Sequence, residues 1–149
     1  MRRDDWRIVD EWIDRLGLGP LRKSSYGELS GGEQRKTLIA AAMVQQPEVL
    51  LLDEPTANLD LYWREQIVAM LDRLFEEHQL TILLVCHALE VIPSACRRLV
   101  LLEDGRPVAE GSPETVLTDQ RIAELYGTRL RVVHADGRHA VLPGGRARP

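Results

Sequence analysis

The pattern of apolar and polar positions predicts helices at the start of the chain. Apolar residues recur at helical spacing in residues 3–16, and Gly17 ends that helix. A second helix is predicted from Gly31 to about Gln45, and Pro47 closes it. No strand pattern interrupts this part, so we expect a small helical lobe.

Apolar runs after residue 46 predict strands that alternate with helices. Val49–Leu52 and Leu80–Cys86 are nearly uninterrupted apolar runs, which are typical of parallel strands buried on both faces. A helix over 61–78 lies between them. Further helices are predicted at 89–95, 113–117 and 120–126, a strand at 99–102 that turns at 104–105 into 107–108, and a hairpin of 130–134 with 139–142 about Asp136-Gly137.

This order predicts an α/β fold class with three segments. Residues 1–46 form the helical lobe, residues 47–127 form a partial parallel-sheet core with flanking helices, and residues 128–149 form a C-terminal β-hairpin and tail.

Composition limits the classes of function. The chain has 149 residues, a formal net charge of −4 and two cysteines. The modest charge gives no reason to expect nucleic acid as a partner, and two cysteines outside any metal-binding spacing give none to expect a disulfide framework. No leader and no membrane-spanning stretch are visible, so we expect a cytoplasmic protein that reaches a membrane through a partner.

A glycine turn before the second helix is the first candidate for chemistry. Ser30 can cap that helix and Glu33 can complete a capping box. Gly31 and Gly32 leave the free N–H groups of the helix start bare, which suits an anion. An ordinary helix cap is the alternative, and the paired glycines argue against it because glycine weakens a helix start.

Acidic and imidazole side chains follow the two predicted strands. Asp53 is suited to hold Mg²⁺ through water, and Glu54 could polarise an attacking water. His87 follows the second strand and could contact a phosphate or orient a water. The alternatives are a solvated strand end for the two acids and a helix cap for His87.

Taken together, these segments resemble the ATP-binding-cassette (ABC) transporter ATPases. Leu29-Ser30-Gly31-Gly32-Glu33 resembles their signature motif, Val49 to Glu54 their Walker B strand with its catalytic glutamate, Ala57-Asn58-Leu59-Asp60 their D-loop, His87 their switch histidine, and Gly105-Arg106 with Glu110 to Pro113 the segment after it. The resemblance covers about Trp6 to Tyr126.

The resemblance implies a P-loop NTPase-like fold and a role for each motif. Two such subunits would pair head to tail around ATP, and the signature residues Leu29, Ser30, Gly31, Gly32, Glu33 and Gln34 would contact the nucleotide held by the other subunit. Asp53 would serve Mg²⁺, Glu54 the hydrolytic water and His87 the γ-phosphate. Asp60 would couple the two sites. The helical lobe would dock a transmembrane permease, so Trp6 or Trp12 would be partly exposed. Core packing is expected for at least one of them.

Two departures from the family pattern matter. Ala88 stands where an acidic residue often follows the switch histidine. The 149 residues also contain no Gly-Lys pair and therefore no phosphate-binding loop of the Gly-x4-Gly-Lys-Ser/Thr kind. We therefore expect this chain alone to have negligible ATPase activity, and to be the back portion of a longer ATPase.

Residues 113–117, residues 122–127 and the hairpin through Asp136-Gly137-Arg138 together resemble the end of importer subunits for metals or metal chelates, such as iron-siderophore, haem, cobalamin, zinc or manganese. A solute-binding protein would then be an indirect partner. The alternatives are a DNA-repair type of ABC ATPase, against which the lack of sustained heptads and of a basic stripe argues, and a non-catalytic remnant of the fold.

Overall fold

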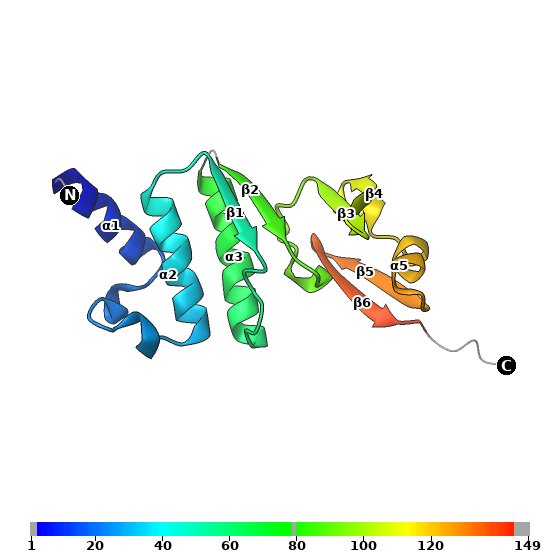
Figure 1. Ribbon diagram of the computed structural model, residues 1–149, viewed down its shortest axis with the longest axis horizontal. Coiled ribbons are helices and arrows are strands. Elements are labelled where there is room, and N and C mark those ends of the chain that lie inside the picture. The colour runs from blue at the N-terminus through cyan, green and yellow to red at the C-terminus, as the bar shows by residue number, and fades with distance from the viewer. Residues whose placement is uncertain (1–2, 79, 145–149) are drawn as a thin grey trace. The chain divides into compact units, whose positions relative to one another are not determined.

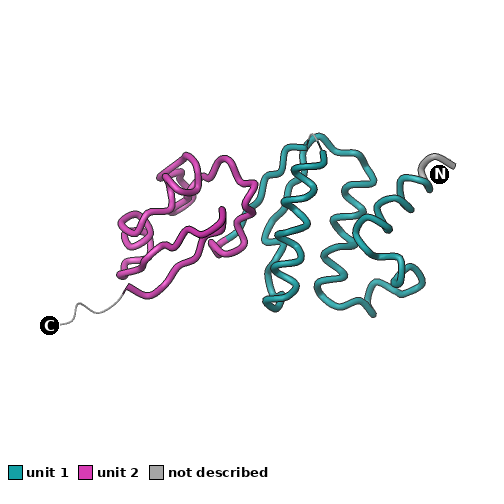
Figure 2. The backbone as a smooth tube through the Cα atoms, turned by 180° about the vertical axis from the view of Figure 1, so that it is seen from behind, with its two compact units in different colours: residues 1–86 teal, residues 87–149 magenta. Residues whose placement is uncertain are grey.

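A computed structural model describes residues 3–78 and 80–144 of the chain (Figure 1). Contacts within the chain define two compact units, one ending at Cys86 and the other beginning at His87 (Figure 2). The expected tail beyond residue 144 lies outside the described residues. Among those described, no helix has the length and apolar character needed to cross a membrane.

Unit 1 begins with helices only, as predicted. They are α1 (Arg3–Arg15), the 3₁₀ turns η1 (Gly19–Leu21) and η2 (Tyr26–Glu28), and α2 (Gly31–Val44). Gly17 adopts a φ of 66° directly after α1, which a side chain would strain, so the predicted glycine stop is confirmed. Trp12 is buried at 6% exposure while Trp6 is 55% exposed, which confirms that the two indoles divide between core and surface.

The rest of unit 1 is a strand–helix–strand unit. β1 (Val49–Asp53) and β2 (Thr81–Val85) pair in parallel, in a register that sets Asp53 opposite Val85, and α3 (Leu61–Glu77) connects them. Figure 1 shows α3 running along one face of the two strands. The core of the unit joins the helical segment to this part through the following residues: Trp12, Leu16, Leu18, Ile39, Ala40, Met43, Leu50, Leu59, Ile67, Met70, Leu71, Leu74 and Leu80.

The expectation that both strands are buried on both faces is wrong. Leu50 points toward α3 and is 4% exposed, whereas its neighbour Leu51 is 69% exposed. Leu83 and Val85 of β2 are exposed with it. Successive side chains of a strand point to opposite faces, and in the described residues only the α3 side has a cover. An apolar run predicts a strand but does not say which face its own chain covers.

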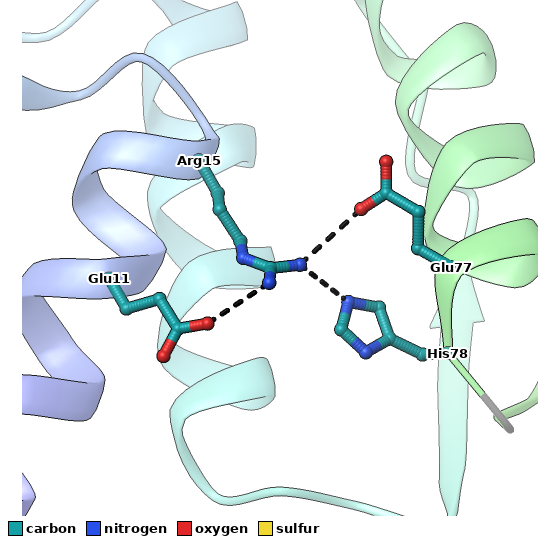
Figure 3. Close-up of polar contacts among 4 residues, drawn as sticks. All are labelled: Glu11, Arg15, Glu77 and His78. Atoms are coloured by element: carbon teal, nitrogen blue, oxygen red, sulfur yellow. Dashed lines mark hydrogen bonds and ion pairs between the residues drawn. The ribbon is translucent and has the colours of Figure 1, made fainter.

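An exposed polar cluster joins α1 to the end of α3 (Figure 3). The Arg15 guanidinium lies 3.1 Å from a Glu11 carboxylate oxygen and 3.3 Å from one of Glu77. It also donates toward Nε2 of His78 at 3.1 Å, and the His78 ring packs 5.2 Å from the Trp12 ring. Arg15 therefore ties the helical segment to the strand–helix–strand unit at the surface, above the buried Trp12.

Unit 2 consists of short elements and two antiparallel hairpins. They are η3 (Leu89–Val91), β3 (Leu99–Glu103), β4 (Arg106–Gly111), α4 (Pro113–Val116), α5 (Asp119–Tyr126), β5 (Leu130–Ala135) and β6 (Arg138–Pro143). β3 pairs with β4 and β5 with β6, and both predicted Asp-Gly turns are confirmed. At the second turn, Asp136 and Gly137 have φ values of 50° and 71°, as a two-residue hairpin turn requires.

Helix α5 and turn η3 cover the β5–β6 hairpin. The buried large apolar residues of unit 2 come from η3 and α4, from the residue after each of these two, and from α5: Val91, Ile92, Val116, Leu117 and Ile122. The predicted helix over 89–95 is shorter than expected and stops after Val91. Pro93 explains this, because the residue before a proline avoids helical geometry, and Ile92 is extended with a ψ of 120°.

The boundary at Cys86 differs from both boundaries of the division inferred from sequence, at 46/47 and 127/128. Helices α1 and α2 share one core with β1 and α3, so residues before and after Pro47 pack as one unit. At the 127/128 boundary, β5 and β6 pack against α5 and η3, so residues on both sides of that boundary also belong to one unit.

Candidate functional site

The two acids lie at the carboxyl edge of the parallel strand pair. Asp53 is the last residue of β1 and is exposed, and Glu54 follows it half-buried. The backbone N–H of Glu54 donates to the carbonyl of Val85 at 2.9 Å, and this bond holds the backbone after Asp53 against the end of β2. Ligands of parallel α/β sheets bind at this edge, so the position suits both acids to a bound substrate.

Glu54 has an unusual backbone. Its φ of 45° lies in the left-handed region, which residues other than glycine seldom adopt. Such residues concentrate at functional sites, where the surrounding structure holds them in place. Here the N–H bond to Val85 and the buried Pro55 that follows provide that restraint.

His87 is placed by β2. It is an exposed residue, two positions after Val85, and it is the first residue of unit 2. Its expected role at a phosphate stays a prediction.

The glycine turn forms the predicted capping box. Ser30 is the N-cap of α2, its N–H donates to a Glu33 carboxylate oxygen at 2.8 Å, and its hydroxyl lies 2.7 Å from the same oxygen. These hydrogen bonds lower the pKa of Glu33, the side-chain bond most, because they favour its charged form. Ser30 and Gly31 are exposed, so the tip of this helix is open to solvent.

The structure shows a packing reason for glycine at both positions, which the sequence alone does not show. A Cβ on Gly32 would overlap the indole ring of Trp63 in α3, and a Cβ on Gly31 would lie 3.3 Å from a methyl carbon of Leu59. Gly32 is therefore required for close packing of α2 on α3. This packing brings the signature-like turn beside Leu59-Asp60, the end of the D-loop-like segment.

Asp60 and Gln34 serve local structure in the described residues. The Asp60 carboxylate accepts the N–H of Trp63 at 2.8 Å and caps α3. The Gln34 amide donates to the carbonyls of Leu29 and Tyr26, at 3.1 and 3.2 Å, and so holds the loop before the turn.

Trp63 is the residue of this region that sequence reasoning missed. In the sequence, Trp63 is one of the apolar positions of the helix predicted over 61–78. Its contact with Gly32 joins residues 31 positions apart in the chain, which no local pattern indicates. The glycine pair was the available signal, since glycine at a helix start indicates a close approach by something.

The chemistry of Asp53 fits a magnesium ion. Mg²⁺ in nucleotide sites keeps several waters and takes one or two carboxylates together with substrate phosphates, rather than a full protein cage. An exposed carboxylate at a strand end provides one such ligand. Over the described residues, no group of three or more histidine, cysteine, aspartate or glutamate residues could hold a metal ion by itself.

Comparison with known proteins agrees with these motifs. Residues 2–57 match the model of the ABC transporter family. The chain is 36% identical over 135 residues to the chelated iron transport system membrane protein YfeB of Yersinia pestis, covering 91% of this chain and 45% of YfeB. This chain belongs to the ABC transporter family.

Two further relatives in this family have different names. Identity is 34% over 128 residues to the hemin import ATP-binding protein HmuV of Escherichia coli O157:H7, covering 82% of this chain and 50% of HmuV. It is 37% over 115 residues to the energy-coupling factor transporter ATP-binding protein EcfA2 of Enterococcus faecalis, covering 76% of this chain and 39% of EcfA2. The chain thus spans about half the length of the curated relatives it matches.

Solved structures give the fold. An ABC transporter in an inward-facing conformation superposes with a TM-score of 0.83 at 23% identity, over 95% of this chain and 57% of that one. CbiO1 of Clostridium perfringens, part of the CbiONQ transporter complex, gives 0.73 at 29% identity, over 83% and 50%. The α/β fold is therefore that of the ABC ATPases, and the predicted P-loop NTPase-like class is confirmed.

Proposed function

We propose that this chain supplies the signature turn and the hydrolytic acids of an ATP-binding subunit in an ABC importer of a metal or metal chelate. The observation that carries the proposal is the Asp53-Glu54 step at the carboxyl edge of a parallel strand pair, with Glu54 held at a φ of 45°. The acids stand where such sheets bind ligands, and the left-handed backbone is typical of functional sites.

Each site residue has a role in this proposal. Glu54 polarises the water that attacks the γ-phosphate of ATP, and Asp53 holds Mg²⁺ through water. His87 contacts the γ-phosphate. Mg²⁺ would neutralise developing phosphate charge.

The signature turn acts on a second subunit. Ser30, Gly31 and Gly32 meet the γ-phosphate of the ATP that the other subunit holds, with Leu29, Glu33 and Gln34 shaping the turn. Asp60 couples the two sites, since the D-loop segment lies beside this turn through Leu59 and Gly31. The solvent-open tip at Ser30 supports a partner that approaches from outside the chain.

The partners would be a second ATPase subunit and transmembrane permease subunits, at the cytoplasmic face of the membrane. The exposed Trp6 of α1 supports a docking role for the helical segment. A solute-binding protein takes part only indirectly, and no residue of this chain touches the solute.

The 149-residue chain alone is proposed to be inactive. The lysine and backbone N–H groups of a phosphate-binding loop provide much of the grip on ATP phosphates, and the sequence contains no Gly-Lys pair. Turnover of purified 149-residue chain at about 1 per second, within the ordinary range for enzymes, would contradict this.

The hydrolytic role is tested in a completed subunit, made by fusing the front half of a relative such as HmuV ahead of this chain. Glu54→Gln should lower the rate of ATP hydrolysis by about 10²-fold or more, because general-base catalysis contributes that much, while ATP binding persists. The matched control is Glu48→Gln, an exposed glutamate just before the opposite end of β1. Unchanged hydrolysis in Glu54→Gln would contradict the assignment.

The solute class is tested by uptake in cells. Support for a metal chelate comes from the names of YfeB and HmuV, while EcfA2 belongs to an energy-coupling factor transporter. Loss of the gene should lower uptake of radiolabelled iron chelate or haem and leave amino-acid uptake unchanged. The reverse pattern would contradict the metal-chelate assignment and leave the ATPase role standing.

A further inference from the structure

Two histidines face each other near the tip of the β5–β6 hairpin. His134 of β5 and His139 of β6 are cross-strand partners. They form the second residue pair from the Asp136-Gly137 turn, after Ala135 and Arg138. Their Nδ1 atoms lie 2.8 Å apart, and their rings are 4.9 Å apart at an angle of 77°. The pair belongs wholly to unit 2.

The partners of these rings determine where the protons sit. Nε2 of His134 lies 3.0 Å from the carbonyl oxygen of Leu117, which can only accept, so Nε2 carries the hydrogen. A neutral His134 then has a bare Nδ1. The 2.8 Å contact between the Nδ1 atoms requires one hydrogen, and His139 therefore donates it. The result is a chain of hydrogen bonds from His139 through His134 to Leu117.

This chain of hydrogen bonds can take up one added proton but not two. One added proton can go to the free Nε2 of His139, or to Nδ1 of His134 if His139 then accepts, and the bond between the rings survives in both cases. A second added proton leaves a hydrogen on both Nδ1 atoms. The bond is then lost, and two imidazolium ions face each other at contact distance.

The groups around the pair act on its charge in opposite directions. His139 is 3% exposed, so its cation is poorly hydrated. Glu114 of α4 attracts a charge on either ring, while Arg138 of β6 repels one on His139. The Asp119 carboxylate of α5 accepts the N–H of Val132 at 2.6 Å, and the backbone carbonyl of Glu90 in η3 accepts from Arg138 at 2.8 Å.

We propose that the His134–His139 pair is an acid-sensitive lock, which holds the hairpin tip to the chain after α4 through Leu117 while it carries at most one extra proton. When both rings are charged, the lock opens and the β5–β6 hairpin loosens from α4 and α5. The device is independent of the nucleotide chemistry and gives unit 2 a pH response of its own.

The direction of the pH response follows from linkage. Burial lowers the pKa of His139 below its ordinary value, His134 lowers it further, and Glu114 only partly opposes them. The open state therefore binds more protons than the closed one, and the lock is stable above about pH 6.5, the ordinary histidine value. Below this pH, each further fall of one pH unit should raise the population of the open hairpin about tenfold, until the lowered pKa of His139 is reached.

The lock is tested by NMR on the full chain between pH 8 and 5. The ring signals of His139 should titrate with a pKa below its ordinary value. Amide exchange protection at Val133 and Ala140 should fall through the same range of pH. His139→Asn keeps a donor near the Nδ1 position and cannot titrate, so its hairpin should keep protection to pH 5.

Controls separate the lock from general acid effects. His78→Gln in unit 1 should leave the hairpin response unchanged. His134→Gln should keep a donor toward Leu117 and raise the pKa of His139 by removing the neighbouring cation, which gives a readout if His139→Asn does not fold. Wild-type protection that is constant down to pH 5, or titration of His139 at its ordinary value, would overturn the proposal.

Discussion

The parallel pair of unit 1 and the β5–β6 hairpin of unit 2 are covered in different ways. In β1, α3 covers one face and no described residue covers the other, so Leu50 is buried and Leu51, the next residue, is open to solvent. The hairpin is packed by α5 and η3, and the polar ring of His139 lies buried in it. The sequence pattern suggests the opposite, because β1 is the more apolar strand. Burial thus depends on what the rest of the chain lays over a strand, and apolar content alone does not decide it.

The largest effect should separate the two faces of β1. Leu50→Ala should lower the free energy of unfolding of unit 1 by about 2–5 kcal/mol, since it leaves a cavity against α3. Leu51→Ala, on the exposed face, should change it by less than about 0.5 kcal/mol. Denaturant titration by tryptophan fluorescence reports on unit 1 alone, because Trp6, Trp12 and Trp63 all lie in it. Equal losses in the two variants would mean that the open face is covered in solution.

The second effect concerns the contact between α2 and α3. Gly32→Ala should lower the free energy of unfolding by about 1–3 kcal/mol, because its methyl group would overlap the Trp63 ring. Gly31→Ala is the matched control: its methyl group would meet only the end of the Leu59 side chain at 3.3 Å. The same denaturant titration measures both. A Gly32→Ala protein as stable as wild type would show that the two helices do not pack as described.

The third effect is the order in which the units respond to acid. Ser30 lowers the pKa of Glu33 in unit 1, so the stability from that carboxylate is complete above its ordinary value and is lost only as pH falls below about 4.5. In unit 2, the stability that depends on an uncharged His139 is lost as pH falls below about 6.5. On acidification, histidine ring signals of unit 2 should therefore change before tryptophan fluorescence does. Simultaneous changes near pH 4 would contradict this order.

The smallest effect is expected at Arg15. Its contacts with Glu11, Glu77 and His78 are exposed, and pairs of this kind contribute about 0.2–1 kcal/mol each. Arg15→Ala should lower the stability of unit 1 by about that amount, with some loss of packing over Trp12. Glu77→Gln removes only one charge and should cost less. A loss above about 2 kcal/mol would show that the cluster is more than a surface contact.

The sequence predicted the order and type of most elements correctly, and it identified the family. Gly17, Pro47 and the two Asp-Gly turns mark boundaries through backbone geometry, which depends on few neighbouring residues. The capping box of Ser30 and Glu33 was predictable for the same reason, since it spans one helical turn.

Other features of the site could not be predicted from the sequence. The left-handed backbone of Glu54 has no local signal, and the Trp63 ring meets Gly32 across many residues of chain. The roles of Glu54, Asp53 and His87 in hydrolysis stay predictions from the family resemblance. What the structure adds is the edge where β1 and β2 end together.

By itself, then, the sequence determined this protein's elements, its turns and the motifs of its family, because these depend on residues close together in the chain. Tertiary structure alone decided the rest: which face of β1 is open, why Gly32 cannot carry a side chain, and that His134 and His139 share a hydrogen bond. The first two depend on contacts between distant segments, whose geometry no local pattern encodes. The two histidines lie only five residues apart across a predicted hairpin turn, but the position of their protons depends on the carbonyl of Leu117, outside the hairpin.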